Sequence, residues 1–313
     1  MTAPADPHLH DAADVPPPVL REVAPSVWVW LQPDGSWGLN NPAFFVGADA
    51  VVAVDTCFTE RRTRGFLDAV ASVTDRPVRT LVNTHHHGDH THGNWLLPAA
   101  TVIGHERCRE EVLATGTAAE LLFPGVEWGE IRVRPPFVTF EDRLTVWVDD
   151  LRVELVHVGP AHTTNDVVAW VPDHRLLLAG DLVFSGGTPF VVMGSVAGSL
   201  AALDRVRALD PAVVVPGHGP VGGPELLDDQ EAYLRWVQEV AADADRAGLG
   251  PLDAARAADL GPFAAWHDPE RLVGNLHRAA SERRGEPLGT PLGLEPLFEM
   301  VELNGGRPLR CLA

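Results

Sequence analysis

The sequence contains no lysine, so each of its 24 basic residues other than histidine is an arginine. Any enzymatic chemistry must therefore proceed without a lysine as catalytic base or Schiff-base former. Cysteine is also scarce, and Cys57, Cys108 and Cys311 are isolated from one another and form no CxxC pair. Scattered cysteines in odd number are typical of free thiols in a reducing compartment, so we expect a cytoplasmic protein.

Long apolar runs and excess positive charge are missing as well. No stretch approaches the roughly 18–20 apolar residues of a membrane-spanning helix. The net charge of −19 argues against nucleic acid or an anionic membrane as a partner, because both bind basic surfaces. Residues 1–20 are acidic and rich in proline, without the basic and apolar regions of a signal peptide, and we expect a disordered leader there.

Apolar runs of strand length and segments of helical spacing occur along the rest of the chain. Residues 27–56 are rich in predicted strands, residues 61–73 have helical spacing, and residues 119–140 are predicted to be irregular. This order predicts an α/β fold in which sheets lie between helical layers, with its core over residues 21–225. The mostly helical residues 226–313 are expected to pack on the same domain as an extension.

The stretch "NTHHHGDHTHGN" places five histidines and an aspartate within residues 83–94, directly after a predicted strand. His85 and His87 are two residues apart, which puts them on the same side of an extended segment. Asp89 and His90 then turn at the start of the next helix and face a second point nearby. The spacing therefore predicts two metal half-sites close to each other.

Further ligands must come from distant parts of the chain. His162, Asp181 and His218 each follow a predicted strand, and strand ends at one edge of a sandwich converge. An aspartate between two metals can bridge them, because each of its oxygens can reach one ion. His86 and His92 are not expected to be ligands, since His86 points away from its neighbours and His92 falls beyond the turn.

The motifs "THHHGDH", "GPAHTTND", "LAGD" and "PGHG", in this order, resemble the metal motifs of the metallo-β-lactamase fold superfamily over residues of about 25–220. The resemblance implies an αββα sandwich with a dinuclear site, usually of zinc, at one edge. It assigns the first metal to His85, His87 and His162. It assigns the second metal to Asp89, His90 and His218, with Asp181 and a hydroxide as bridges and Asp55 supporting the site from behind.

Such a metal centre would supply a base or nucleophile at neutral pH in a chain that has no lysine. Two cations lower the pKa of a shared water toward neutrality, polarise a carbonyl and stabilise an oxyanion or enolate. Asp89 is placed to manage the proton, and Asp181 is the second candidate for this relay. An intact ligand set also argues against the alternative of a non-catalytic protein that merely kept the fold.

Several branches of this superfamily do not match the sequence. Secreted β-lactamases carry a signal peptide and have cysteine or serine in place of Asp181, and members that process nucleic acids are basic and contain an additional nuclease domain. Glyoxalase II-like thioester hydrolases and lactonases share all seven ligands. Lactonases often use a tyrosine near the metals, whereas Tyr233, the single tyrosine here, lies in a late predicted helix.

Segments outside the ligands, among them "GSWGLNNPAFFVG", "GVEWGEIRVRPPFVTFEDRLTV" and "LNGGRPLRCLA", resemble the second-ring cyclases and thioesterases of bacterial aromatic polyketide pathways. This resemblance implies intramolecular aldol condensation of a polyketide and, for members that release the chain, hydrolysis of a thioester on acyl carrier protein. A general thioester or lactone hydrolase is the alternative. The oligomeric state stays open, a homo-oligomer included. A flat substrate needs an aromatic pocket, for which the candidates near the ligand loops are Trp95, Trp128, Pro189 and Phe190.

Overall fold

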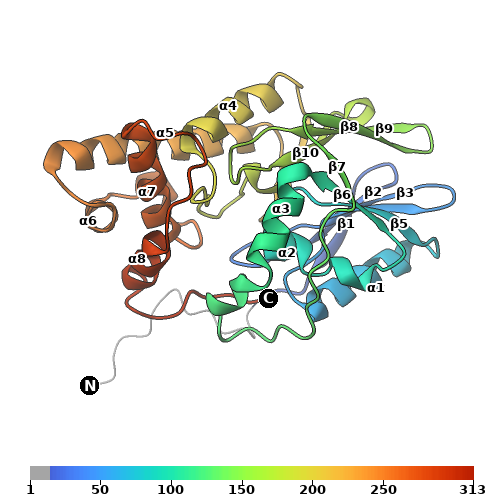
Figure 1. Ribbon diagram of the computed structural model, residues 1–313. Helices are drawn as coiled ribbons and strands as arrows, with labels where there is room; N and C mark the ends of the chain where they lie inside the picture. Colours follow the sequence, from blue (N-terminus) through green and yellow to red (C-terminus); the bar gives the residue numbers. More distant parts are fainter. Residues whose placement is uncertain (1–14) are drawn as a thin grey trace.

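The computed structural model describes residues 15–313 (Figure 1). The leader expected over residues 1–20 thus lies mostly outside the described residues. Its last two residues, Val19 and Leu20, instead begin strand β1, because they pair with Leu31 and Trp30 of the next strand.

Within residues 15–313 the strands form two sheets. The seven-stranded sheet follows chain order: β1 (Val19–Ala24), β2 (Val27–Leu31), β3 (Ala43–Val46), β4 (Val51–Val54), β5 (Val78–Val82), β6 (Thr101–His105) and β7 (Val138–Phe140). The five-stranded sheet has the order β12 (Val213–Val215), β11 (Leu176–Leu178), β10 (Val167–Val171), β9 (Leu151–His157) and β8 (Arg143–Val148).

Alternating side chains along β2 and β3 explain why the two sheets pack face to face. Successive residues of a strand point to opposite faces of its sheet. Val29 and Phe45 therefore join an apolar core with Leu155 of the second sheet. Trp30 and Phe44 point to the other face, where they pack with a helix. Both faces of the first sheet are thus buried, as a layered α/β fold requires.

Helices cover the outer faces of both sheets (Figure 1). On the first sheet these are α1 (Glu60–Val73) and α3 (Glu106–Thr115), with the one-turn α2 (Gly88–Thr91) between them in sequence. On the second sheet they are α4 (Val196–Arg207) and α5 (Glu225–Ala247), followed by α6 (Pro251–Ala257), α7 (Arg271–Arg283) and α8 (Glu295–Leu303). The αββα sandwich with additional C-terminal helices is therefore confirmed.

Local sequence signals explain the helix ends. Thr59 caps α1, since its side chain accepts a hydrogen bond from the Arg62 amide, and Phe66 and Val70 bury one stripe of this helix. Gly116 ends α3 with φ +55°, a conformation that favours glycine.

Strand β7 lies within the segment that the sequence predicts to be irregular. Its three residues pair in parallel with β6, and two of them are exposed. The sequence therefore lacks the alternation of buried residues that would predict a strand here. Between residues 15 and 313, no helix combines the length and the apolar character needed to cross a membrane.

Candidate metal centre

The predicted ligands arrive from separate loops that meet at one edge of the sandwich. The histidine run connects β5 to α2, and His162 lies between β9 and β10. Asp181 lies in a short turn after β11, and His218 follows β12. Within the described part of the chain these side chains form two groups whose potential ligand atoms lie within 4.8 Å of one another: His85, His87, His162 and Asp181 in the first, and Asp89, His90 and His218 in the second.

The carboxylate of Asp181 lies between the two groups. Its Oδ2 is 3.3 Å from His162 Nε2 and 3.4 Å from His218 Nε2. Its Oδ1 is 3.1 Å from His90 Nε2. This placement matches the bridging role that the family resemblance implies for Asp181.

The donor set fits divalent metal ions. His85 Nε2, His90 Nε2 and Asp181 Oδ1 are buried and make no hydrogen bond, although the last two are 3.1 Å apart. His87 Nδ1 and His162 Nε2 are only 2.8 Å apart. Buried polar atoms normally have partners, and a cluster of imidazole nitrogens around carboxylates is the set that zinc binds.

Each histidine of the cluster uses its second ring nitrogen to contact an acceptor outside the cluster. These contacts are His85 Nδ1 with Thr84 Oγ1 (3.1 Å), His87 Nε2 with Met193 Sδ (3.3 Å), His90 Nδ1 with Asp55 Oδ2 (2.8 Å), His162 Nδ1 with the Phe190 carbonyl, and His218 Nδ1 with the Gly35 carbonyl (3.1 Å). An imidazole that donates from one nitrogen keeps a lone pair on the other, so these partners fix the tautomers that metal binding needs.

Asp55 orients one ligand of each group. Its carboxylate accepts hydrogen bonds from His90 Nδ1 and from the amide and hydroxyl of Thr84, at 2.7–2.8 Å. Because the Thr84 hydroxyl donates to Asp55, it accepts from His85. Asp55 also has φ +61°, a left-handed conformation that aspartate and asparagine adopt more readily than other residues. Asp55 therefore supports the cluster from behind, as expected.

Hydrogen bonds and a close backbone approach hold two other ligand loops in place. Asp166 holds the loop of His162, since its carboxylate accepts hydrogen bonds from the Thr163 amide at 2.9 Å and the Thr163 hydroxyl at 2.7 Å. Gly217 allows the loop of His218 to approach Asp181, because any side chain at this position would collide with Asp181 Oδ1.

Burial and the carboxylates set the charge of the cluster. Burial holds the pKa of His85 and His87 well below the usual value, and neighbouring imidazoles add to this effect. Burial also disfavours a charged His218, but the carboxylates of Asp181 and Asp89 outweigh it and raise its pKa to about 9. The site thus favours positive charge next to its two aspartates, which is the charge that metal ions supply.

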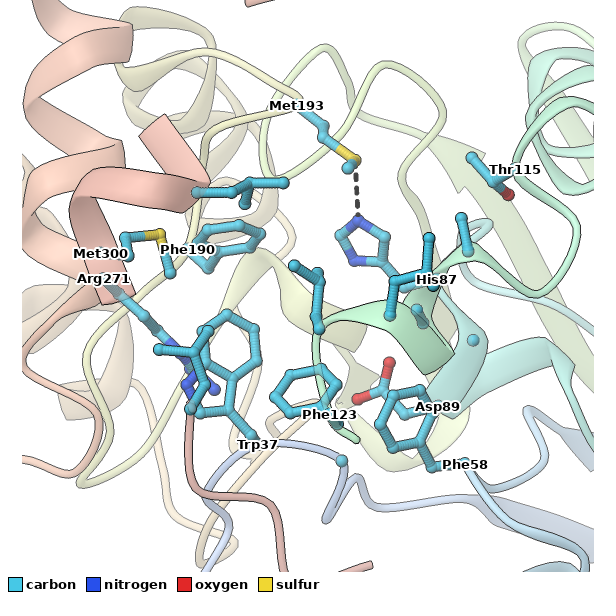
Figure 2. A pocket seen from close by; sticks show the side chains of 18 of the residues that line it. Trp37, Phe58, His87, Asp89, Thr115, Phe123, Phe190, Met193, Arg271 and Met300 are labelled. Atoms are coloured by element: carbon cyan, nitrogen blue, oxygen red, sulfur yellow. Dashed lines mark hydrogen bonds between the residues drawn. The ribbon is translucent and has the colours of Figure 1, made fainter. Parts of the chain in front are cut away.

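A cavity of about 680 Å³ opens directly onto this cluster (Figure 2). His87 and Asp89 lie at its floor, and Asp89 exposes 14% of its side chain, against 4% for Asp181. The walls are mostly apolar and come from the loop before β3, from residues 115–124, and from α8 with the segment after it.

The cavity includes one of the four pocket residues predicted from sequence. Phe190 lines the cavity, but Trp95, Trp128 and Pro189 do not. Trp128 packs behind Phe58, with ring centroids 4.7 Å apart. The Arg132 guanidinium lies over the Trp95 ring. The Pro189 carbonyl accepts a hydrogen bond from the Asn275 side-chain amide. Closeness to the ligand loops in sequence therefore does not identify the side chains that reach the cavity.

Most of the residues that line the cavity are not predicted by the sequence. Trp37, Phe58 and Phe123 form part of one wall, and Leu297 and Phe298 of α8 form part of another. The segment of α8 is apolar, but nothing in the sequence indicates that it lines a cavity next to the metal cluster.

His86 and His92 also line the cavity, and neither belongs to the two ligand groups. His86 Nδ1 is 3.0 Å from the Asn165 side-chain amide. His92 stacks on Phe58 with centroids 5.5 Å apart. The three cysteines are free, and Cys57 and Cys108 are buried.

Comparison with known proteins agrees with this fold and cluster. The model of the metallo-beta-lactamase superfamily matches residues 36–218, which is more than half of the chain. The chain belongs to the metallo-β-lactamase superfamily.

Relatives within this superfamily have diverse activities. The chain is 29% identical over 194 residues to the 2,4-dinitroanisole O-demethylase subunit alpha of Nocardioides sp. (strain JS1661), a match that covers 61% of this chain but only 55% of that subunit. It is 27% identical to the metallo-beta-lactamase type 2 of Bacteroides fragilis, over 65% of this chain and 79% of that enzyme. It is 30% identical to the hydroxyacylglutathione hydrolase of Methylococcus capsulatus, over 41% of this chain and 43% of that enzyme.

Solved structures share the fold. The metallo-beta-lactamase from Pontibacter korlensis superposes with a TM-score of 0.58 at 21% identity, over 70% of this chain and 99% of that one. The family and the two ligand groups together identify a metallo-hydrolase superfamily enzyme with the donors for a dinuclear centre.

Replacement of Asp55 by asparagine should weaken metal binding about tenfold to a hundredfold, because the neutral amide orients His90 and His85 less firmly. Competition with a chelator measures this affinity. The matched control is Asp210→Asn, which also has a left-handed backbone (φ +57°) but pairs with Arg175 on the surface. Equal affinities in both variants would show that Asp55 does not support the cluster.

Replacement of Asp181 by asparagine should lower the metal content and reduce activity at least tenfold to a hundredfold, since one bridging oxygen becomes an amide group that cannot bind a cation. His86→Ala should cost less, because His86 contacts Asn165 rather than the cluster. Elemental analysis and activity assays of both variants provide the comparison. Similar losses in the two variants would contradict the ligand assignment.

Proposed function

We propose that the protein is a dinuclear metal enzyme that closes a ring of an aromatic polyketide intermediate by intramolecular aldol condensation with loss of water. The observation that carries this proposal is a large apolar cavity that ends on the buried His/Asp cluster. A substrate that fills the cavity would bring its carbonyl groups to the cluster while its carbon skeleton contacts apolar walls.

The character of the cavity favours an apolar carbonyl substrate over a glutathione conjugate. Among the described residues that line it, Arg271 is the only lysine or arginine, and its side chain is buried and paired with Asp268 at 2.8 Å. Glutathione carries two carboxylates that require cationic partners. A poly-β-ketone carries carbonyl oxygens and no obligatory charge, which suits these walls.

The metal pair would acidify a water molecule and polarise a substrate carbonyl when bound. The chain's own residues would hold and move the proton. Asp89 is the more exposed of the two aspartates at the cavity floor, and its Oδ2 lies 3.2 Å from His218 Nε2. In the proposed reaction it accepts a proton from the acidic methylene and returns it to the alkoxide oxygen of the aldol product, with Asp181 behind it. Dehydration of the aldol product then yields the aromatic ring.

The apolar walls contribute by excluding bulk water from this reaction. Phe190 contacts both His87 and His162, with ring centroids 6.3 and 6.2 Å apart. An enolate formed beside these rings is protected from protonation by solvent, and electrostatic interactions are stronger where water is excluded.

Thioester hydrolysis is the second candidate function. The similarity to hydroxyacylglutathione hydrolases of Methylococcus capsulatus and Rhodospirillum rubrum, each at 30% identity, supports it. The same cluster can direct water at a thioester carbonyl. A polyketide presented on acyl carrier protein would offer both reactions to one site, so we propose this carrier as the partner for substrate delivery.

The test is incubation of the metal-loaded protein with a short thioester mimic of a monocyclic or bicyclic β-polyketide, followed by chromatography and mass spectrometry. We expect a product lighter by one water, and a free acid in addition if the thioester is cleaved. Chelator-treated protein is the control. The proposal fails if neither product forms while a simple lactone or a glutathione thioester is turned over rapidly.

A further inference from the structure

Trp37, which lies between β2 and β3, is at the centre of an aromatic belt along the cavity wall (Figure 2). Its ring centroid is 5.1 Å from that of Phe190 and 5.5 Å from that of Phe123. Phe123 in turn contacts Phe58 at 5.6 Å. Phe190 borders His87 of the metal cluster. The belt therefore leads from the cluster along one side of the cavity, and Trp37 connects its two halves.

The indole of Trp37 is held in place by residues at the beginning of α7. Its Nε1 donates a hydrogen bond to Glu270 Oε1 at 2.7 Å. The guanidinium carbon of Arg271 lies 3.8 Å from the ring centroid and covers one face of the indole. Arg271 is itself fixed, because it donates to the Thr188 carbonyl at 2.9 Å and pairs with Asp268.

The backbone around Trp37 is held as well. Cys311 Sγ donates to the Trp37 carbonyl at 3.2 Å. The next residue, Gly38, has φ +75°, and a side chain there would collide with Phe58 and with the Cys311 sulfur. Both the backbone and the ring plane of Trp37 are thus set before any ligand enters.

We propose that Trp37 determines the substrate specificity of the cavity: its indole, positioned by Glu270 and Arg271, binds the ring system of a planar, fused-ring acyl substrate and directs the acidic methylene of that substrate to Asp89. This inference rests on the proposed function, because it takes the cavity to be the substrate site. It adds the substrate class, a flat fused-ring compound rather than a flexible acyl chain, and it assigns the residues that select this class.

The physical basis is the rigidity of the belt. Aromatic contacts contribute about threefold to tenfold in affinity beyond the burial of apolar area, and only a planar ligand makes them. A flexible chain gains the area alone and loses internal rotations on binding, whereas a wall that is already ordered loses little. Fixation of Trp37 from two sides therefore favours flat ligands over open-chain ligands of similar size.

Calorimetric titration of the zinc-loaded protein with two unreactive amides tests this inference. The planar probe is 2-naphthamide, and the open-chain probe of similar size is decanamide. For Trp37→Leu we expect the affinity for 2-naphthamide to fall about tenfold and that for decanamide to change by less than about twofold. Equal weakening of both probes, or no change in either, would overturn the proposal.

Further variants separate positioning from simple packing. Glu270→Ala should lower the affinity for 2-naphthamide about threefold, and Glu270→Gln should restore it, because the glutamine oxygen still accepts the indole hydrogen bond. Trp147→Leu is the matched control, since Trp147 lies on β8 with 60% of its surface exposed and should leave both affinities unchanged. If Glu270→Gln fails to restore the affinity, Glu270 does not position Trp37.

Thermal melting of each variant establishes that it is folded. Should Trp37→Leu not fold, Trp37→Phe keeps a ring but loses the hydrogen bond to Glu270, and it should show a smaller loss confined to 2-naphthamide. The amides undergo no reaction, so this outcome is independent of catalysis. Planar selectivity that depends on Trp37 without polyketide turnover would support this inference and refute the proposed function, and turnover without such selectivity would do the reverse.

Discussion

The buried carboxylate of Asp181 between two groups of imidazoles is the interaction on which the site depends. Burial would raise the pKa of this carboxyl, but the surrounding imidazoles of His218 and His90 hold it well below its usual value. An ionised carboxylate buried among imidazoles is costly unless positive charge compensates it. The loops after β5, β9, β11 and β12 are all arranged so that their side chains meet around this one group.

Two parts of the chain form the site. The metal cluster and Trp37 lie within residues 36–218, the part that matches the superfamily. Residues outside that match, namely Arg271, α8 and the segment after it, also line the cavity. Arg271 in addition covers one face of the Trp37 indole. The candidate metal ligands thus lie in the part that matches the superfamily, whereas part of the cavity wall lies outside it.

The metal cluster could be predicted from the sequence because its signals are local. The spacing of His85, His87 and Asp89 follows from the geometry of an extended segment that turns into a helix. The distant ligands can be predicted because each of them comes shortly after a predicted strand. The sandwich could be predicted for the same reason, since strand and helix periodicities are local. The three-residue strand β7 has too few buried positions to produce such a pattern.

The cavity could not be predicted, because its walls depend on tertiary packing. Trp128 and Trp37 are both tryptophans in loops next to glycine, yet Trp128 packs behind Phe58 and Trp37 lines the cavity. Only tertiary contacts distinguish them, such as the hydrogen bond from the Trp37 indole to Glu270 at the start of α7, more than 200 residues away in sequence.

The central claim is that the cluster holds two metal ions, and elemental analysis of protein purified without chelator tests it most directly. Two groups of ligands predict about two divalent ions per chain, and their removal should lower the melting temperature, because ions that bind only the folded state stabilise it. A metal content near zero after equilibration with zinc, together with an unchanged melting temperature, would contradict the account.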